Sequence, residues 1–197
     1  MKKLAIALAF LTVLSSPVAA QDFQKGFVAY NAGDFATALK EWKPLAEQGR
    51  VSAQIYLGYL YDGGLGVPQD YKEAVKWYLL AAEQGDASAQ FNLCGMSASG
   101  QGVPQDHKEV LKWCLLAAEQ GHAIAQSNLG ALHINGRGVL QDNVMAHMWY
   151  NIAAANGYSK SGEWRNEVAG RMTQSDIYKA QAMARECMNS GYKKCGY

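Results

Sequence analysis

The residues of this 197-residue chain that could do chemistry are four cysteines and four histidines. Paired cysteines form disulfides, a Cys-x-x-Cys pair can exchange them, and cysteine with histidine at short spacing can hold zinc. The sequence contains neither Cys-x-x-Cys nor His-x-x-x-His. We therefore expect no metal site, no cofactor and no catalytic redox pair. The candidates are Cys94, Cys114, Cys187 and Cys195 among the thiols, and His107, His122, His133 and His147 among the imidazoles.

The segments that must position these residues repeat every 36 residues. The dipeptide Gln-Gly recurs at positions 48, 84 and 120, and Asn156-Gly157 continues the series. The pair Ala-Gln, the run Gly-Val-x-Gln-Asp and the tryptophans Trp77, Trp113 and Trp149 keep the same period. A fixed period shared by several motifs indicates a repeat protein whose stacked units bury one continuous core.

Each unit predicts two antiparallel helices. Apolar residues recur at three- and four-residue steps, as in Val75, Tyr78 and Ala82, which marks one face of a helix. Asp70 suits an N-cap, and Glu73 stands three residues later, as in a capping box. The glycines of the Gln-Gly pairs suit the left-handed position after a helix. A glycine-rich stretch in the middle of each unit supplies the turn between its helices.

Taken together, the motifs resemble the Sel1-like repeat, a relative of the tetratricopeptide repeat (TPR). The shared pattern is A-Q-x-x-L-G-x-x-Y, then G-x-G-V-x-Q-D, then A-x-x-W-Y-x-x-A-A-x-Q-G. The resemblance implies an all-α fold, a right-handed solenoid of antiparallel helix pairs. It divides the chain into an N-terminal TPR-like half-unit at 21–49, three repeats at 50–85, 86–121 and 122–157, and C-terminal capping helices with a tail at 158–197.

Residues 1–20 are typical of a secretory signal peptide. Lys2 and Lys3 precede an apolar run at 4–14, and Val-Ala-Ala at 18–20 supplies a cleavage site. The run is about half the ~20 residues that a membrane-spanning helix needs. We therefore expect a periplasmic or secreted protein with no membrane span after signal removal. The net charge of +1 is too small to indicate a nucleic-acid or anionic-membrane surface.

The repeat register predicts how the cysteines pair. Cys94 takes the position of Gly58 in the preceding repeat, and Cys114 takes that of Tyr78. A bridge between the two helices of this pair would fill the space that a tyrosine fills elsewhere. The other two cysteines would then tie the tail back onto the last helix. The alternative is four reduced thiols that pack as small apolar residues, whereas an exported protein favours the disulfides.

The histidines and carboxylates have structural explanations. His133 and His147 take expected core positions, whereas His107 and His122 lie near helix starts and should be solvated. Asp70 and its equivalents recur with the repeat, as caps do, while an acid–base pair would interrupt the repeat at one special place. We therefore predict that the protein is not an enzyme.

The binding surface is expected on the first helix of each pair, which lines the concave side of such solenoids. Residues there that neither define the repeat nor fill its core form an apolar strip with few charges. Such a strip suggests a site for a peptide or a partner helix. The alternative is that the next repeat partly buries these side chains. The candidates are Ile55, Tyr59, Asp62, Phe91, Ile124, Ser127 and Ile134.

The function that these features favour is an exported, monomeric scaffold or adaptor that mediates protein–protein interaction in the cell envelope. Two alternatives stay open, an immunity-type inhibitor of a secreted toxin and a cell-wall or β-lactam hydrolase. Tight binding to one toxin would identify the first, and turnover of peptidoglycan fragments or β-lactams would identify the second. No residue of the sequence matches a hydrolase site.

Overall fold

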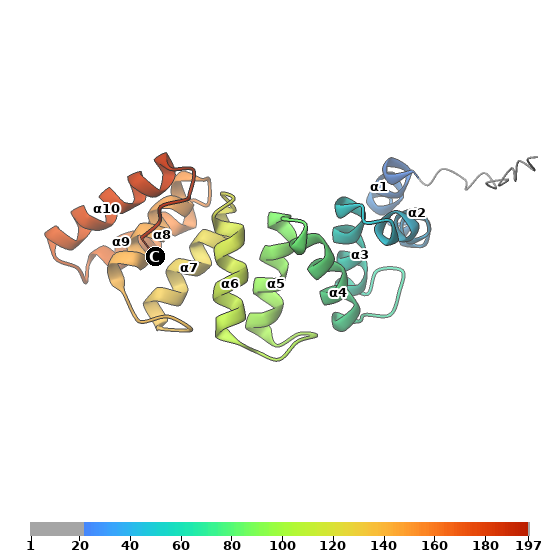
Figure 1. Ribbon diagram of the computed structural model, residues 1–197, viewed down its shortest axis with the longest axis horizontal. Helices are drawn as coiled ribbons and strands as arrows, with labels where there is room; N and C mark the ends of the chain where they lie inside the picture. Colours follow the sequence, from blue (N-terminus) through green and yellow to red (C-terminus); the bar gives the residue numbers. More distant parts are fainter. Residues whose placement is uncertain (1–21, 197) are drawn as a thin grey trace, which may run out of the picture.

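The computed structural model describes residues 22–196, and the predicted signal peptide, residues 1–20, lies outside them. Within the described part the chain forms ten α-helices and no strand, which follow one another in a row of antiparallel pairs (Figure 1). The predicted all-α solenoid is confirmed. The helices are α1 (Phe23–Asn31), α2 (Phe35–Glu47), α3 (Val51–Gly63), α4 (Tyr71–Glu83), α5 (Ala87–Ser99), α6 (His107–Ala118), α7 (Ala123–Asn135), α8 (Asn143–Ala155), α9 (Lys160–Ala169) and α10 (Gln174–Asn189).

An aspartate begins the second helix of each repeat. The Asp70 carboxylate accepts hydrogen bonds from the backbone N–H groups of Lys72 and Glu73 at 2.9 and 3.1 Å, and its equivalents begin α6 and α8. The reciprocal half of the predicted capping box is not formed. The Asp70 N–H instead donates to the carbonyl of Tyr61 in α3 at 2.9 Å. This bond joins the two helices of the pair.

A buried glutamine joins each repeat to the helix pair before it. The Gln54 side chain donates to the carbonyl of Ala46 in α2 at 3.1 Å and accepts from the Gln84 amide at the end of α4 at 2.8 Å. The same two bonds recur at Gln90 and Gln126. A buried amide is costly unless it is hydrogen-bonded. This link therefore explains why Ala-Gln and Gln-Gly recur at one period.

A tyrosine or a disulfide fills the centre of a repeat. In the first repeat the Tyr78 ring lies against Gly58 so closely that a Cβ on the glycine would collide with it. In the second repeat the Cys94–Cys114 disulfide joins α5 to α6 across a Cα–Cα distance of 5.2 Å, and both cysteines are buried. Sulfur thus occupies the space that the ring occupies elsewhere, as the repeat register predicts.

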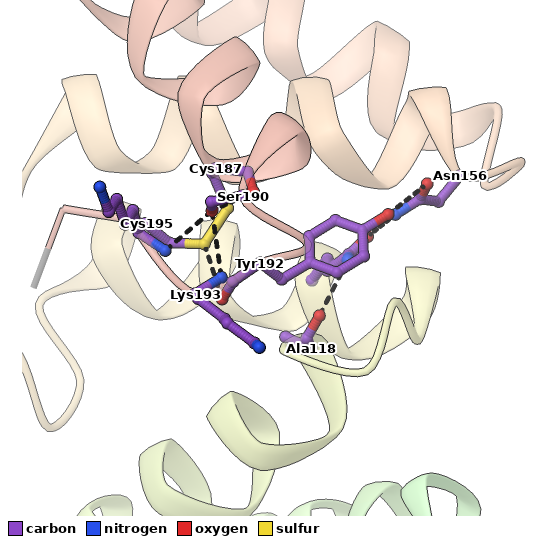
Figure 2. Close-up of a disulfide and its surroundings, with 9 residues drawn as sticks. Ala118, Asn156, Cys187, Ser190, Tyr192, Lys193 and Cys195 are labelled. Atoms are coloured by element: carbon purple, nitrogen blue, oxygen red, sulfur yellow. Dashed lines mark hydrogen bonds between the residues drawn. A yellow bond between two sulfur atoms is a disulfide. The ribbon is translucent and has the colours of Figure 1, made fainter.

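The two ends of the solenoid differ from the repeats. At the N-terminal end, which we expected to be a half-unit, α1 and α2 form a complete antiparallel pair around the fully buried Trp42. At the C-terminal end, α9 and α10 both pack on α8. The tail then turns back, and the Cys187–Cys195 disulfide holds it against the end of α10 (Figure 2). Both expected disulfides are present in the structure.

Candidate functional site on the first-helix face

The first-helix face is the surface formed by α1, α3, α5, α7 and α9, and these helices carry all seven predicted binding residues. Their burial differs along the face. Ile124 is exposed, whereas Ile55 and Ser127 are buried. The half-buried candidates are Tyr59, Asp62, Phe91 and Ile134.

Ile55 and Ser127 are buried and not exposed on the first-helix face. Ile55 is 9 % exposed and Ser127 is 2 % exposed. The two share one repeat position, which faces the following repeat: the hydroxyl of Ser127 accepts a hydrogen bond from Ser161 in α9 at 2.8 Å. The prediction that these two residues are exposed in an apolar strip was therefore wrong, because stacking in a solenoid covers one side of every first helix.

Phe91 occupies the same repeat position and is half-buried. A histidine covers part of its ring. The rings of Phe91 and His122 stack with centroids 4.3 Å apart. His122 Nδ1 also accepts a hydrogen bond from the backbone N–H of Ala125 at 3.2 Å, which makes it the N-cap of α7. Burial lowers the pKa of His122. The expectation of a solvated His122 was therefore wrong, because capping and stacking hold the ring between two repeats.

Aromatic rings cover the N-terminal part of the first-helix face. The Tyr56 ring is at the centre of this cluster, and its neighbours are Phe23, Phe27, Tyr30, Trp42 and Tyr59, with centroids 5.7, 5.8, 5.6, 4.5 and 5.7 Å away. Most of these pairs meet edge to face, an arrangement that aromatic quadrupoles favour. The cluster fixes Tyr59 at its border, next to the second repeat.

Beside Tyr59, a buried hydroxyl lies near a carboxylate. The rings of Tyr59 and Tyr78 meet edge to face with centroids 5.8 Å apart. The Tyr78 hydroxyl is buried and has no hydrogen-bond partner of ordinary geometry among the described residues. Burial and, after it, the nearby Asp62 carboxylate raise the pKa of Tyr78, and burial raises the pKa of Asp62. Asp62 is thus the polar group that this part of the face offers to a ligand.

The middle of the first-helix face is flat. Gly95 and Ala98 take the positions of Tyr59 and Asp62 in the second repeat, and both are exposed. A Cβ on Gly95 would meet no atom within 4 Å. A ligand that lies along the face would therefore meet no large side chain at these two positions of the second repeat.

A pocket of about 240 Å³ opens at the C-terminal end of the face, between α7, α8 and α9. Ile134 and Trp164 provide apolar walls, and the half-buried Ala131 leaves room between them. The pocket is suited to a single large apolar side chain. Its lining residues are Ser127, Asn128, Ala131, Ile134, Tyr150, Trp164, Glu167, Val168 and Arg171.

Polar groups border this pocket. Arg171 donates to the Glu167 carboxylate at 2.7 Å, as an exposed ion pair at the rim. The half-buried side chain of Asn128 makes no hydrogen bond to another residue of the described chain. A side-chain amide can donate and accept at once, so Asn128 can bind the backbone of an extended peptide. The Trp164 ring is held by Tyr150, with centroids 5.7 Å apart.

Sequence reasoning placed only part of this pocket. It included Ile134 and Ser127, of which only Ile134 is accessible, and it missed Trp164 and Asn128. Trp164 follows the three repeats, so no register assigned it a position. Asn128 is an amide in a helix, which matches no motif. The available signal was a tryptophan in a segment, residues 158–197, predicted to form capping helices and a tail.

The described residues offer packing and hydrogen-bonding groups at this site. Within residues 22–196, no group of three or more histidine, cysteine, aspartate or glutamate side chains is arranged to hold a metal ion. None of the described helices combines the length and the hydropathy needed to cross a membrane.

Comparisons with known proteins agree with the 36-residue register. The Sel1 repeat family model matches residues 51–86, 87–122 and 123–158. The crystal structure of a Sel1 repeat protein from Oxalobacter formigenes is 38 % identical, with a TM-score of 0.68 over 71 % of this chain and 58 % of that chain. A protective antigen present in uropathogenic Escherichia coli strains, which displays an SLR fold, is 27 % identical, with a TM-score of 0.53 over 86 % of this chain and 46 % of that chain. This chain thus spans about half the length of both solved chains, and no curated protein matches it.

Proposed function

The chain belongs to the Sel1 repeat family, and we propose that it is an exported scaffold that binds a peptide or helix of a partner protein along its first-helix face. Sel1 repeat proteins generally mediate protein–protein interaction, and their fold is typically a non-catalytic scaffold. The two disulfides indicate an oxidising, non-cytoplasmic compartment. The cell envelope is such a compartment, and the signal-like residues 1–20 support it.

The observation that carries the proposal is the pocket between α7 and α9. Binding energy in protein interfaces is concentrated where a few large side chains fill well-packed pockets. The pocket provides apolar walls from Ile134 and Trp164, and Asn128 beside them has an unused amide. An apolar side chain of the partner enters the pocket while Asn128 binds the backbone next to it.

The rest of the face suggests the character of the bound segment. From the pocket, the segment crosses the flat region at Gly95 and reaches Tyr59 and Asp62. The Asp62 carboxylate lies beside Tyr59 at that end, so a basic residue is favoured next to it. The proposed ligand therefore carries an apolar anchor at one end and a lysine or arginine at the other.

The test is photo-crosslinking in the native cell, with the reactive side chain placed at Tyr59, at Ala131 or at Tyr178. Tyr178 is the control, because it is an aromatic residue of α10 and 64 % exposed. We expect the same partner protein to be captured from Tyr59 and from Ala131, and not from Tyr178.

A second variant tests whether one ligand uses both ends. Ala131→Trp fills the pocket, so it should abolish capture from Tyr59 while leaving the melting temperature of the protein close to that of the parent. Capture from Tyr178 alone, or capture from Tyr59 that persists in the Ala131→Trp variant, would show that the first-helix face is not the site.

A further inference from the structure

The tail of the chain shows what the opposite side of the solenoid can bind. The Tyr192 ring lies on Gly121, just after α6, where a Cβ would be 3.3 Å from the ring. Its hydroxyl donates to the side-chain oxygen of Asn156, just after α8, at 3.0 Å. Figure 2 shows the ring between these two helix ends. The groove between neighbouring second helices therefore accepts a tyrosine.

The repeat builds the same groove upstream, between α2 and α4. Gly49 corresponds to Gly121 two repeats later, and a Cβ on it would meet no atom within 4 Å. Gln84 corresponds to Asn156. In both, the amide nitrogen donates to the buried glutamine of the repeat, at 2.8 Å in each case. The side-chain oxygen of Asn156 accepts from the tail, whereas no described residue donates to that of Gln84.

The upstream groove is also open. It forms a cavity of about 720 Å³, with Ala46, Trp77 and Leu80 among its apolar lining residues. Leu80 is 39 % exposed, whereas its equivalent in α8, Ile152, is fully buried in the cluster that includes α10. A groove that the chain covers at its C-terminal end is thus left uncovered near its N-terminal end.

The charges around the two grooves correspond as well. The tail continues from Tyr192 into Lys193, which lines a cavity of about 400 Å³ together with Glu119 of the α6 end. Glu47, the last residue of α2, holds the repeat position of Glu119, which follows α6. Glu83 adds a second exposed carboxylate across the groove. Two lysines, Lys43 and Lys76, line the upstream groove as well, and Lys76 pairs with Glu73 at 3.0 Å. Glu47 and Glu83 are therefore the carboxylates that favour a basic residue next to the tyrosine.

We propose that the groove between α2 and α4 is a second binding site, which takes a partner segment with a tyrosine followed by lysine or arginine. The ring packs on Gly49, the hydroxyl donates to the side-chain oxygen of Gln84, and the basic residue faces Glu47 and Glu83. The site lies on second helices, so it does not depend on the first-helix face proposed above.

The probe that tests this site is the tail itself, as a labelled peptide of residues 187–196 closed by its own disulfide. It is titrated into the full chain, whose own tail occupies the downstream groove, and binding is followed by fluorescence anisotropy. We expect saturable binding. Gln84→Ala should weaken it about fivefold, as for one lost hydrogen bond, and Gln120→Ala, the equivalent change one repeat later, should leave it unchanged.

A double-mutant cycle assigns the contact. The peptide carrying Tyr192→Phe should bind about fivefold more weakly to the parent chain, with no further loss when the protein carries Gln84→Ala, because both changes remove one bond. Glu47→Lys with Glu83→Lys alters exposed residues only, so it weakens binding without risk to the fold. Glu163→Lys on α9 is its control.

Three results would overturn the proposal. The first is no binding of the peptide to the parent chain. The second is an equal loss from Gln120→Ala, or from Asn156→Ala, which would place the peptide in another groove. The third is that the losses of binding free energy from Gln84→Ala and from the Tyr192→Phe peptide add fully. This would show that the tyrosine hydroxyl does not bind the glutamine.

Discussion

The Tyr78 ring and Gly58 are in direct contact, and no side chain on residue 58 could share their space. One repeat later the same two positions hold Cys94 and Cys114, joined by a disulfide. A tyrosine ring packed on a glycine and a disulfide between two cysteines therefore fill the same space between the helices of a pair. Their equivalence can be tested by exchanging one for the other.

Gly58→Ala should destabilise the protein by about 1–3 kcal/mol, because the added methyl group must displace a buried ring. The matched control is Gly95→Ala in the next repeat, also inside a first helix. There a Cβ meets no atom within 4 Å, and alanine is the better helix former. Gly95→Ala should thus be neutral or stabilising. Chemical denaturation measures both, and equal effects would contradict the packing argument.

The double variant Cys94→Ala/Cys114→Ala should lose about 3 kcal/mol of unfolding free energy, because the bridge closes a loop between residues 20 apart. Cys94→Gly/Cys114→Tyr instead rebuilds the glycine and tyrosine of the other repeats. We expect it to be more stable than the double alanine variant in both oxidising and reducing buffer. If it is less stable, the tyrosine does not fill the space of the bridge.

Gln126→Leu should cost about 2 kcal/mol, because it removes two hydrogen bonds of a buried side chain. The carbonyl of Ala118 loses the bond from the Gln126 amide and keeps only that from the Gly121 N–H. The substitution also removes the acceptor of the Asn156 amide. Gln174→Leu, at an exposed position in α10, is the control and should change stability by less than about 0.5 kcal/mol. Thermal and urea unfolding would detect the difference, and similar values for both would argue against the glutamine link.

Acidification should destabilise the fold through its histidines. Burial lowers the pKa of His122, His133 and His147 in the folded protein, so the unfolded chain takes up protons first. Stability is therefore complete above the unfolded pKa of about 6.5 and is lost as the pH falls below it, by at most about 1.4 kcal/mol per histidine and pH unit. The melting temperature should fall between about pH 7.5 and about pH 5.5.

A histidine variant tests whether the buried imidazoles cause this pH dependence. His147→Gln removes one buried imidazole and should reduce the slope of melting temperature against pH. The buried carboxylate of Glu41 does not contribute to the pH dependence in this range, because its hydrogen bond with Lys25 lowers its pKa below the usual value for glutamate. A melting temperature that is constant over this range would show that the three histidines do not titrate on unfolding.

Much of the architecture could be predicted from the sequence because local interactions produce it. The 36-residue period, the aspartate caps and the glycines after the helices act within a few residues of chain. The cysteine pairing also followed from the repeat, since two repeats with the same backbone must place Cys94 and Cys114 where Gly58 and Tyr78 meet. The function of the buried glutamines did not follow, because their partners lie in other helices.

Tertiary packing decided which parts of the surface are open. Ile55 and Tyr59 lie one helical turn apart in the same helix, yet stacking buries the first and leaves the second half-buried. Trp164 enters a pocket only because α9 packs on α8. The fold of α10 onto α8 is likewise unmarked in the sequence, because an amphipathic helix carries the same local pattern whichever neighbour it covers. The repeating unit, its caps and its covalent links can thus be predicted from local sequence patterns. The covered and uncovered grooves depend on contacts between distant segments, which meet only in the folded chain.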